Sequence, residues 1–176
     1  MLVLLAAVVA GIAGEPSPAV IAPGTVSIRP ASPATLPPET GRAFDEAVER
    51  AMLRARFTPL PGEGHGRYVA TVTVDRTSRG VVASDYPATS GPLASLNGSV
   101  SLSLPPGGDR LSDLVVTRLT VAIARRGDPA VLWSGSAVTA RVSGTRPGAI
   151  DTVAQTLADA VIGQFPHQAP TALSIP

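Results

Sequence analysis

Two stretches with the periodicity of an α-helix enclose a series of alternating segments, and this order constrains the fold more than any other feature of the chain. The first stretch, residues 40–56, carries apolar side chains at every third or fourth position, namely Phe44, Ala47, Val48, Ala51, Met52 and Ala55. The second carries Ile150, Val153, Ala154, Leu157, Val161 and Phe165, and it ends before Pro166. This spacing places the apolar side chains on one face of each helix. Each predicted helix therefore needs an apolar layer to pack against.

The segments between the two predicted helices alternate with a period of two. Apolar and polar residues take turns along residues 68–74, 98–104, 114–124 and 130–142. This pattern is typical of strands with one buried and one solvent-facing side, as in an antiparallel sheet. The order of elements predicts an α+β fold. We expect a two-layer sandwich, in which both helices cover one face of an antiparallel sheet of four or five strands.

The first residues of the chain predict export. Leu2–Ala13 is an unbroken apolar run, too short to cross a bilayer but of the length found in a signal peptide. No basic side chain precedes it, and the alternative is an N-terminal strand or a buried core segment. We expect residues 1–14 to be a signal peptide. The mature protein would then reside in the periplasm or cell envelope without a stable membrane span.

The remaining boundaries follow from proline content and patterning. Residues 15–40 contain seven prolines, which predicts a linker, with residues 25–29 as a short edge strand inside it. Residues 41–166 are expected to form a single α+β domain. Residues 167–176 lack periodicity and are expected to be a disordered tail.

Charge and cysteine content exclude several classes of protein. The 14 basic residues, all arginines, nearly balance the 13 acidic ones and form no basic stripe, which argues against a nucleic-acid partner. The absence of cysteine excludes disulfides, thiolate metal sites and a cysteine nucleophile. It also excludes the lipid-bearing cysteine of a bacterial lipoprotein.

Candidate chemistry is sparse. The run Glu63-Gly64-His65-Gly66 contains two good metal ligands, but a site needs three or four, so a surface turn is favoured. Asp75 and Asp85 flank a polar loop and could serve a hydrolase together with His65, although aspartates in such loops commonly stabilise turns. We predict no catalytic, cofactor-binding or metal-binding residues, no cofactor, and no enzymatic activity.

Two aromatic residues are candidates for contact with a partner. By alternation, Trp133 lies on the opposite side of its strand from Leu132, so it is expected to point away from the helices, where a tryptophan suits protein recognition. The favoured interpretation is nevertheless that a loop, residues 81–96, covers it. Tyr86 lies in that loop and has the same two interpretations.

Local motifs near Trp133 resemble a known family. Leu119–Ile123, a turn, and then Val131–Ala137 with its Leu-Trp-Ser-Gly sequence are similar to a strand pair in the bacterial envelope lipoproteins of domain-of-unknown-function family 4136. The closing Gln164-Phe165-Pro166 is also similar to the end of that family's domain. The chain departs from the family in lacking the lipid-bearing cysteine and in carrying prolines where the family has an aromatic-rich opening strand. The resemblance implies an envelope location and a two-layer sandwich, and it implies no activity.

Together these features predict a non-enzymatic, exported accessory protein of the envelope. It would bind an envelope protein through the open face or the edge of its sheet. One alternative is a periplasmic module that binds a small apolar or lipid ligand between sheet and helices. The other is a hydrolase with a carboxylate site near Asp75 and Asp85.

Overall fold

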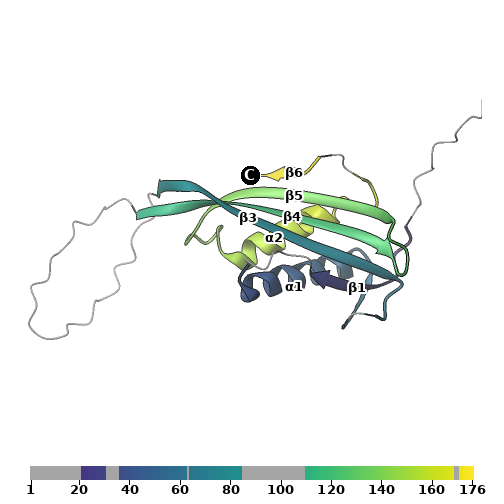
Figure 1. The fold of residues 1–176 in the computed structure, drawn as a ribbon. Helices are drawn as coiled ribbons and strands as arrows, with labels where there is room; N and C mark the ends of the chain where they lie inside the picture. The colour runs from purple at the N-terminus through teal and green to yellow at the C-terminus, as the bar shows by residue number, and fades with distance from the viewer. Residues whose placement is uncertain (1–20, 31–35, 63, 85–109, 169–170) are drawn as a thin grey trace, which may run out of the picture.

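The computed structural model describes residues 21–30, 36–62, 64–84, 110–168 and 171–176, and it has an α+β fold (Figure 1). Its elements are β1 (Thr25–Pro30), α1 (Pro38–Arg54), β2 (Thr58–Leu60), β3 (Tyr68–Ser84), β4 (Arg110–Arg125), β5 (Val131–Val142), α2 (Ile150–Ile162) and β6 (Leu173–Ile175). Asp85, Tyr86 and the strand expected at residues 98–104 lie outside the described residues.

The described strands form one mixed sheet of six, in the order β2-β1-β3-β4-β5-β6. The centre is antiparallel, because β4 pairs antiparallel with both β3 and β5. The flanks are parallel: β1 runs parallel to β2 and β3, and β5 runs parallel to β6. The prediction of a purely antiparallel sheet of four or five strands is therefore wrong. Each parallel partner is reached through a crossover that contains a helix, α1 or α2, which is the usual connection between adjacent parallel strands.

The sheet extends beyond the predicted domain at both ends. β1 lies within residues 15–40, yet it is sandwiched between β2 and β3 and its Val26 is fully buried. Its single proline, Pro30, is at the last paired position. β6 lies within residues 167–176 and pairs with Ala137–Thr139 of β5. The strand expected at residues 25–29 is therefore present, but it is an inner strand and not an edge strand, and the prediction of a disordered tail at 167–176 is wrong for β6.

Both helices lie against the same face of the sheet (Figure 1). The inward side chains of three central strands line up in rows, for example Val72 of β3 opposite Val121 of β4, with Gly135 of β5 next in line. The buried stripes of α1 and α2 complete one hydrophobic core with them. The amphipathic helices thus cover the sheet as their periodicity predicts.

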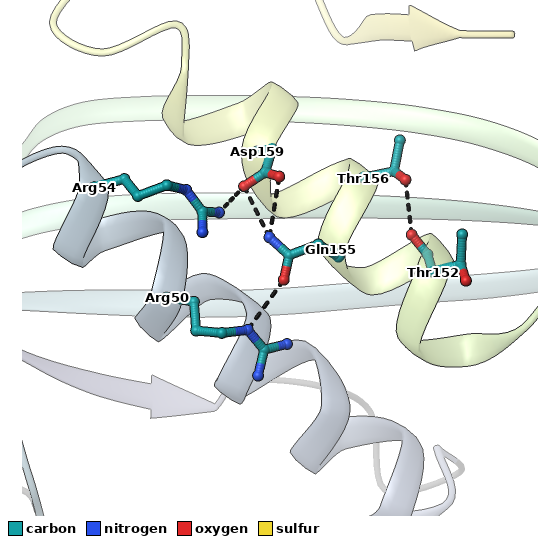
Figure 2. A network of polar contacts seen from close by, with 6 residues as sticks. All are labelled: Arg50, Arg54, Thr152, Gln155, Thr156 and Asp159. Carbon is teal, nitrogen blue, oxygen red and sulfur yellow. Dashed lines mark hydrogen bonds and ion pairs between the residues drawn. The ribbon is translucent and has the colours of Figure 1, made fainter.

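The two helices run in the same direction. Arg50 Nε of α1 donates a hydrogen bond of 3.0 Å to Gln155 Oε1 of α2, and Arg54 pairs with Asp159 one turn later on both helices. Figure 2 shows these side chains bridging the two helices along their exposed sides. Because the sequence separation is 105 residues for both contacts, the helices are parallel and end at the same end of the sheet.

Helix α1 ends in a Schellman motif whose left-handed position is not a glycine. Phe57 N donates to Met52 O and Arg56 N donates to Leu53 O, both at 3.0 Å. Arg56 has a φ of 67°, a conformation that glycine adopts at little steric cost. Phe57 is buried by this turn, and its ring packs edge-on against Tyr68 at the start of β3.

Strands β3 and β4 continue past the helix layer as a two-stranded arm (Figure 1). Their pairing runs as far as Ser84 opposite Arg110, whereas β5 leaves β4 at the pair Leu114 and Val142. The register shifts between Ser78 and Val81. Such an irregularity bends and twists a strand pair. The arm was not predicted, because the alternation expected for β3 ended at Val74.

Candidate interaction surface

The face of the sheet that points away from the helices has small, uncharged side chains at its centre. We call this set the outer-face patch; it consists of Thr71, Thr73, Thr120, Ala122, Ser134 and Ser136. The register places them in two adjacent rows across β3, β4 and β5, and all are half-buried. In the described part of the chain, both helices lie on the other face and every strand belongs to this sheet. No described element therefore covers the patch.

Charged side chains lie only at the borders of this patch. Exposed Asp75 of β3 lies opposite exposed Arg118 of β4, one row beyond Thr73 and Thr120. On the β1 side of the patch, Arg29 of β1 lies beside Thr71 of β3. The centre of this face is uncharged and its rim is charged, which matches the depletion of charged residues from interface cores, although serine and alanine are depleted there as well.

The outermost strands offer little backbone to a partner. β2 and β6 are three residues each, and the middle residue of β2 is Pro59, which has no N–H group. Short edge strands and prolines are common protections against pairing with another chain. This protection is local, because β6 pairs with only Ala137–Thr139 of β5, and β1 pairs with β3 only as far as Val72. Both predicted contact surfaces, the face and the edge of the sheet, are therefore present in the described structure.

Trp133 does not belong to this surface. Its side chain is 1 % exposed and points towards the helices, so the prediction that it faces away from them is wrong. Its ring lies over Gly135 and close to Val161 of α2, while its Nε1 donates a hydrogen bond of 3.0 Å to His167 O. Gly135, on the same side of β5, has no side chain and leaves the space that the indole fills.

An aromatic row closes the core at this end of the sheet. The Trp133 ring packs edge-on against Phe165 at 5.7 Å between centroids, and Phe165 packs edge-on against Phe57 at 5.2 Å. Phe57 in turn meets Tyr68 at 6.2 Å. Edge-to-face packing of this kind adds stability beyond the area buried. The row uses most of the few aromatic residues of the chain for structure.

A pocket of about 300 Å³ lies between the C-terminal ends of the helices. Its walls are Ala51, Arg54, Ala55, Asp159, Ile162, Gly163 and Phe165. The volume is at the lower end of the range for small-molecule sites. The exposed Arg54–Asp159 pair forms part of its wall. The predicted apolar or lipid ligand would bind between the sheet and the helices, and this pocket lies elsewhere.

The residues proposed for a hydrolase do not converge in the described structure. His65 is exposed and adjoins Gly66, which lies against Val26 and Ser27 near the start of β3. Asp75 is seven residues beyond Tyr68 on that strand, a distance of about 23 Å at the rise of an extended chain. Hydrogen-bond reach between the two groups is therefore excluded. Asp85 lies outside the described residues.

The described residues contain neither a cluster of metal ligands nor a membrane-spanning helix. Glu63 is not among them, and the described His, Asp and Glu side chains form no group of three that could hold a metal ion. Neither α1 nor α2, the two described helices, combines the length and hydropathy needed to cross a bilayer.

One carboxyl group is perturbed by its surroundings. Partial burial on α1 raises the pKa of the Asp45 carboxyl, because desolvation disfavours the charged form. Asp45 lies one residue after the fully buried Phe44 and is remote in sequence from the acidic groups considered above. Its environment affects the stability of the fold and identifies no reaction.

Comparison with known proteins gives similarity of structure only. No protein-family model matches the chain, and a search of curated proteins finds no relative. The chain is similar to a PelC dodecamer from Paraburkholderia phytofirmans, with 18% identity, a TM-score of 0.47, and coverage of 83% of this chain and 91% of that one. The resemblance to family 4136 therefore stays a prediction.

Two further solved structures are similar at the same level. One is a Xanthomonas campestris protein of family DUF330, with 11% identity, a TM-score of 0.46, and coverage of 85% of this chain and 87% of that one. The other is a neuraminyllactose-binding hemagglutinin homolog from Helicobacter pylori, with 9% identity, a TM-score of 0.44, and coverage of 82% and 83%. These values assign the chain to none of the three families.

Proposed function

We propose that this chain is an exported, non-enzymatic accessory protein of the cell envelope that binds another protein through the outer-face patch. The observation that carries this proposal is the uncharged centre of the sheet, left uncovered by every described element. The apolar run Leu2–Ala13 supports export.

The chemistry of the patch suits a flat protein surface. Threonine, serine and alanine project only a short distance from a sheet, so a partner can approach the backbone closely over several strands. Asp75 and Arg118 at the border carry opposite charges, which can set the orientation of the partner. The size of the patch, three strands wide, suits a partner that presents its own sheet or a flat helix pair.

Site-specific photocrosslinking in the native host tests this function. A photoreactive phenylalanine at Thr120, in the centre of the patch, is expected to form one defined protein adduct. The same group at Glu49, exposed on α1 on the helix side of the molecule, is the matched control and should not form it. The additional substitution Ser136→Arg, directly opposite Thr120, should abolish the adduct by placing a charge in the contact.

Equal adducts at Thr120 and Glu49, or none at Thr120, would contradict binding through the patch. Export is tested separately by cell fractionation and by mass spectrometry of the N-terminus. Unprocessed protein recovered from the cytosol would contradict it.

A further inference from the structure

We propose that the end of the sheet carrying Arg67, Arg125 and Arg126 docks on an anionic phospholipid surface. We call these three residues the arginine end. This inference concerns a different surface and a different partner from the outer-face patch, and it applies to the chain that still carries residues 1–14.

The three arginines lie next to one another at the end of the β3–β4 ladder. Arg126 N donates to Arg67 O at 3.0 Å, and Arg125 lies opposite Tyr68 in the register. Arg67 and Arg125 are exposed, and Arg126 is half-buried. The guanidinium carbon of Arg67 lies 5.3 Å from the centre of the Tyr68 ring, which holds this charge close to the surface.

Neutral groups hold the Arg126 side chain without cancelling its charge. Its Nε donates to Gly66 O and its Nη2 donates to Ser27 Oγ at 2.8 Å. The remaining N–H groups of the guanidinium, which has five in all, can still meet an anion. This arrangement fixes the position of the charge in advance, so binding costs less side-chain entropy than it would for an unrestrained arginine.

Acidic side chains do not neutralise the arginine end in the described structure. Among the described residues, no carboxylate lies within ion-pair distance of Arg67, Arg125 or Arg126, since the ion pairs found there involve other arginines. Asp128 in the following turn keeps its negative charge at this end; its carboxylate accepts a hydrogen bond from Ala130 N and forms no ion pair with these arginines. Glu63 lies in the preceding loop by sequence, outside the described residues. Arg56, at the end of α1, adds a further positive charge at the same end.

The N-terminal segment enters the fold at this same end, which selects a membrane as the occupant. Thr25 Oγ1 accepts a hydrogen bond from Arg67 N, so the chain that precedes β1 begins beside the arginines. Seven residues, 14–20, separate the apolar run ending at Ala13 from Ile21. They can span at most about 28 Å. In the chain that still carries residues 1–14, before the removal expected for a signal peptide, insertion of the apolar run into a bilayer keeps the arginine end close to the lipid headgroups, where each arginine favours anionic lipid.

Co-sedimentation of the full chain with vesicles tests the proposal. Binding to vesicles of phosphatidylcholine alone gives the affinity due to the apolar run. The increase in affinity for vesicles with about 30% phosphatidylglycerol gives the electrostatic contribution. We expect the anionic vesicles to bind about 10- to 100-fold more tightly at low salt, an increment that high salt removes. The double variant Arg67→Gln/Arg125→Gln should lose about 10- to 30-fold of that increment.

The matched control removes the same two charges at the opposite end of the molecule. Arg42 on α1 and Arg146 before α2 are both exposed, and Arg42→Gln/Arg146→Gln should keep the full increment. Thermal unfolding checks that both double variants fold; Arg126 is left intact because it joins β1 to β4. Equal binding to both vesicle types, or equal losses in the two variants, would overturn the proposal. Inorganic phosphate could also be added as a competitor, with chloride at equal ionic strength as its control. If phosphate weakened vesicle binding more than chloride did, the arginine end would be a site for free anions, and the proposal would be overturned as well.

Discussion

The indole ring of Trp133 occupies the space above Gly135, two residues further along β5 on the same side of the sheet. A Cβ atom at Gly135 would lie 2.7 Å from Cη2 and 2.8 Å from Cζ2 of that ring. The backbone at this position therefore serves as the floor of the tryptophan site. Val161 of α2 lies 3.3 Å from the same point, so the ring has little room to move aside.

Substitution of Gly135 by alanine should lower the stability of the protein. The added methyl group collides with the ring, and overpacking of this kind costs about 1–3 kcal/mol. Urea unfolding measures the loss, and tryptophan fluorescence reports whether the ring has moved. Ser136→Ala, on the outer face of the same strand, is the control and should change stability by less than about 0.5 kcal/mol. A neutral Gly135→Ala variant would show that the core is looser than the contact distances imply.

The Arg54–Asp159 pair should couple the two helices only weakly. Both side chains are about half exposed, at 54% and 47%, so solvent screens the attraction. A double-mutant cycle with Arg54→Ala and Asp159→Ala is expected to give a coupling energy of about 0.3–1 kcal/mol. The coupling should fall at high salt. A coupling above about 2 kcal/mol would mean that the pair is more shielded from water than its exposure indicates.

Replacing Arg56 by glycine should stabilise the protein. Arg56 holds the left-handed position of a Schellman motif, where a side chain is disfavoured, and relief of that strain should contribute about 0.5–1 kcal/mol. Thermal unfolding would show the gain as a higher Tm. Glu49→Gly, at an exposed position inside α1, is the matched control and should lose about 1 kcal/mol because glycine weakens a helix. A loss in both variants would point to a stabilising contact of the Arg56 side chain.

Asp45→Asn should stabilise the protein at neutral pH but not in acid. Because burial raises the pKa of Asp45 in the folded state, its contribution to stability is most favourable below the unfolded pKa of about 3.9 and declines as the pH rises through the folded pKa. Asparagine removes this titration. Urea unfolding of both proteins between about pH 3 and pH 7 should therefore show a gain that grows with pH. A gain that is constant with pH would instead reflect helix propensity.

The sequence was sufficient for the long, patterned elements. The apolar stripes of the two helices are visible in Phe44–Ala55 and Ile150–Phe165, and α1 begins and ends only two residues before the predicted bounds. The alternation along β4 and β5 is equally clear. These elements are long enough for a period to be read, which is why the α+β class could be predicted and is confirmed.

Two features could not be predicted in the same way, namely the short strands and the choice of which side of β5 faces the helices. β2 and β6 have three residues each, too few to show a period, and both are held by a neighbouring strand that only the tertiary fold supplies. For β5, alternation shows that Trp133 and Ser134 face opposite ways but not which of them faces the helices. That choice depends on the space above Gly135, a property of three dimensions.

The connections between neighbouring strands differ greatly in length, and this has a consequence for the order of folding. β4 and β5 are joined by the tight turn at Arg126–Ala130, where Gly127 has a φ of 80° and Asp128 N donates to Arg125 O. β3 and β4 are separated by residues 85–109, and the strands of each parallel pair are separated in sequence by a helix. Since closing a longer loop costs more entropy, we expect the β4–β5 hairpin to form first and to act as the template on which both helices and the outer strands assemble.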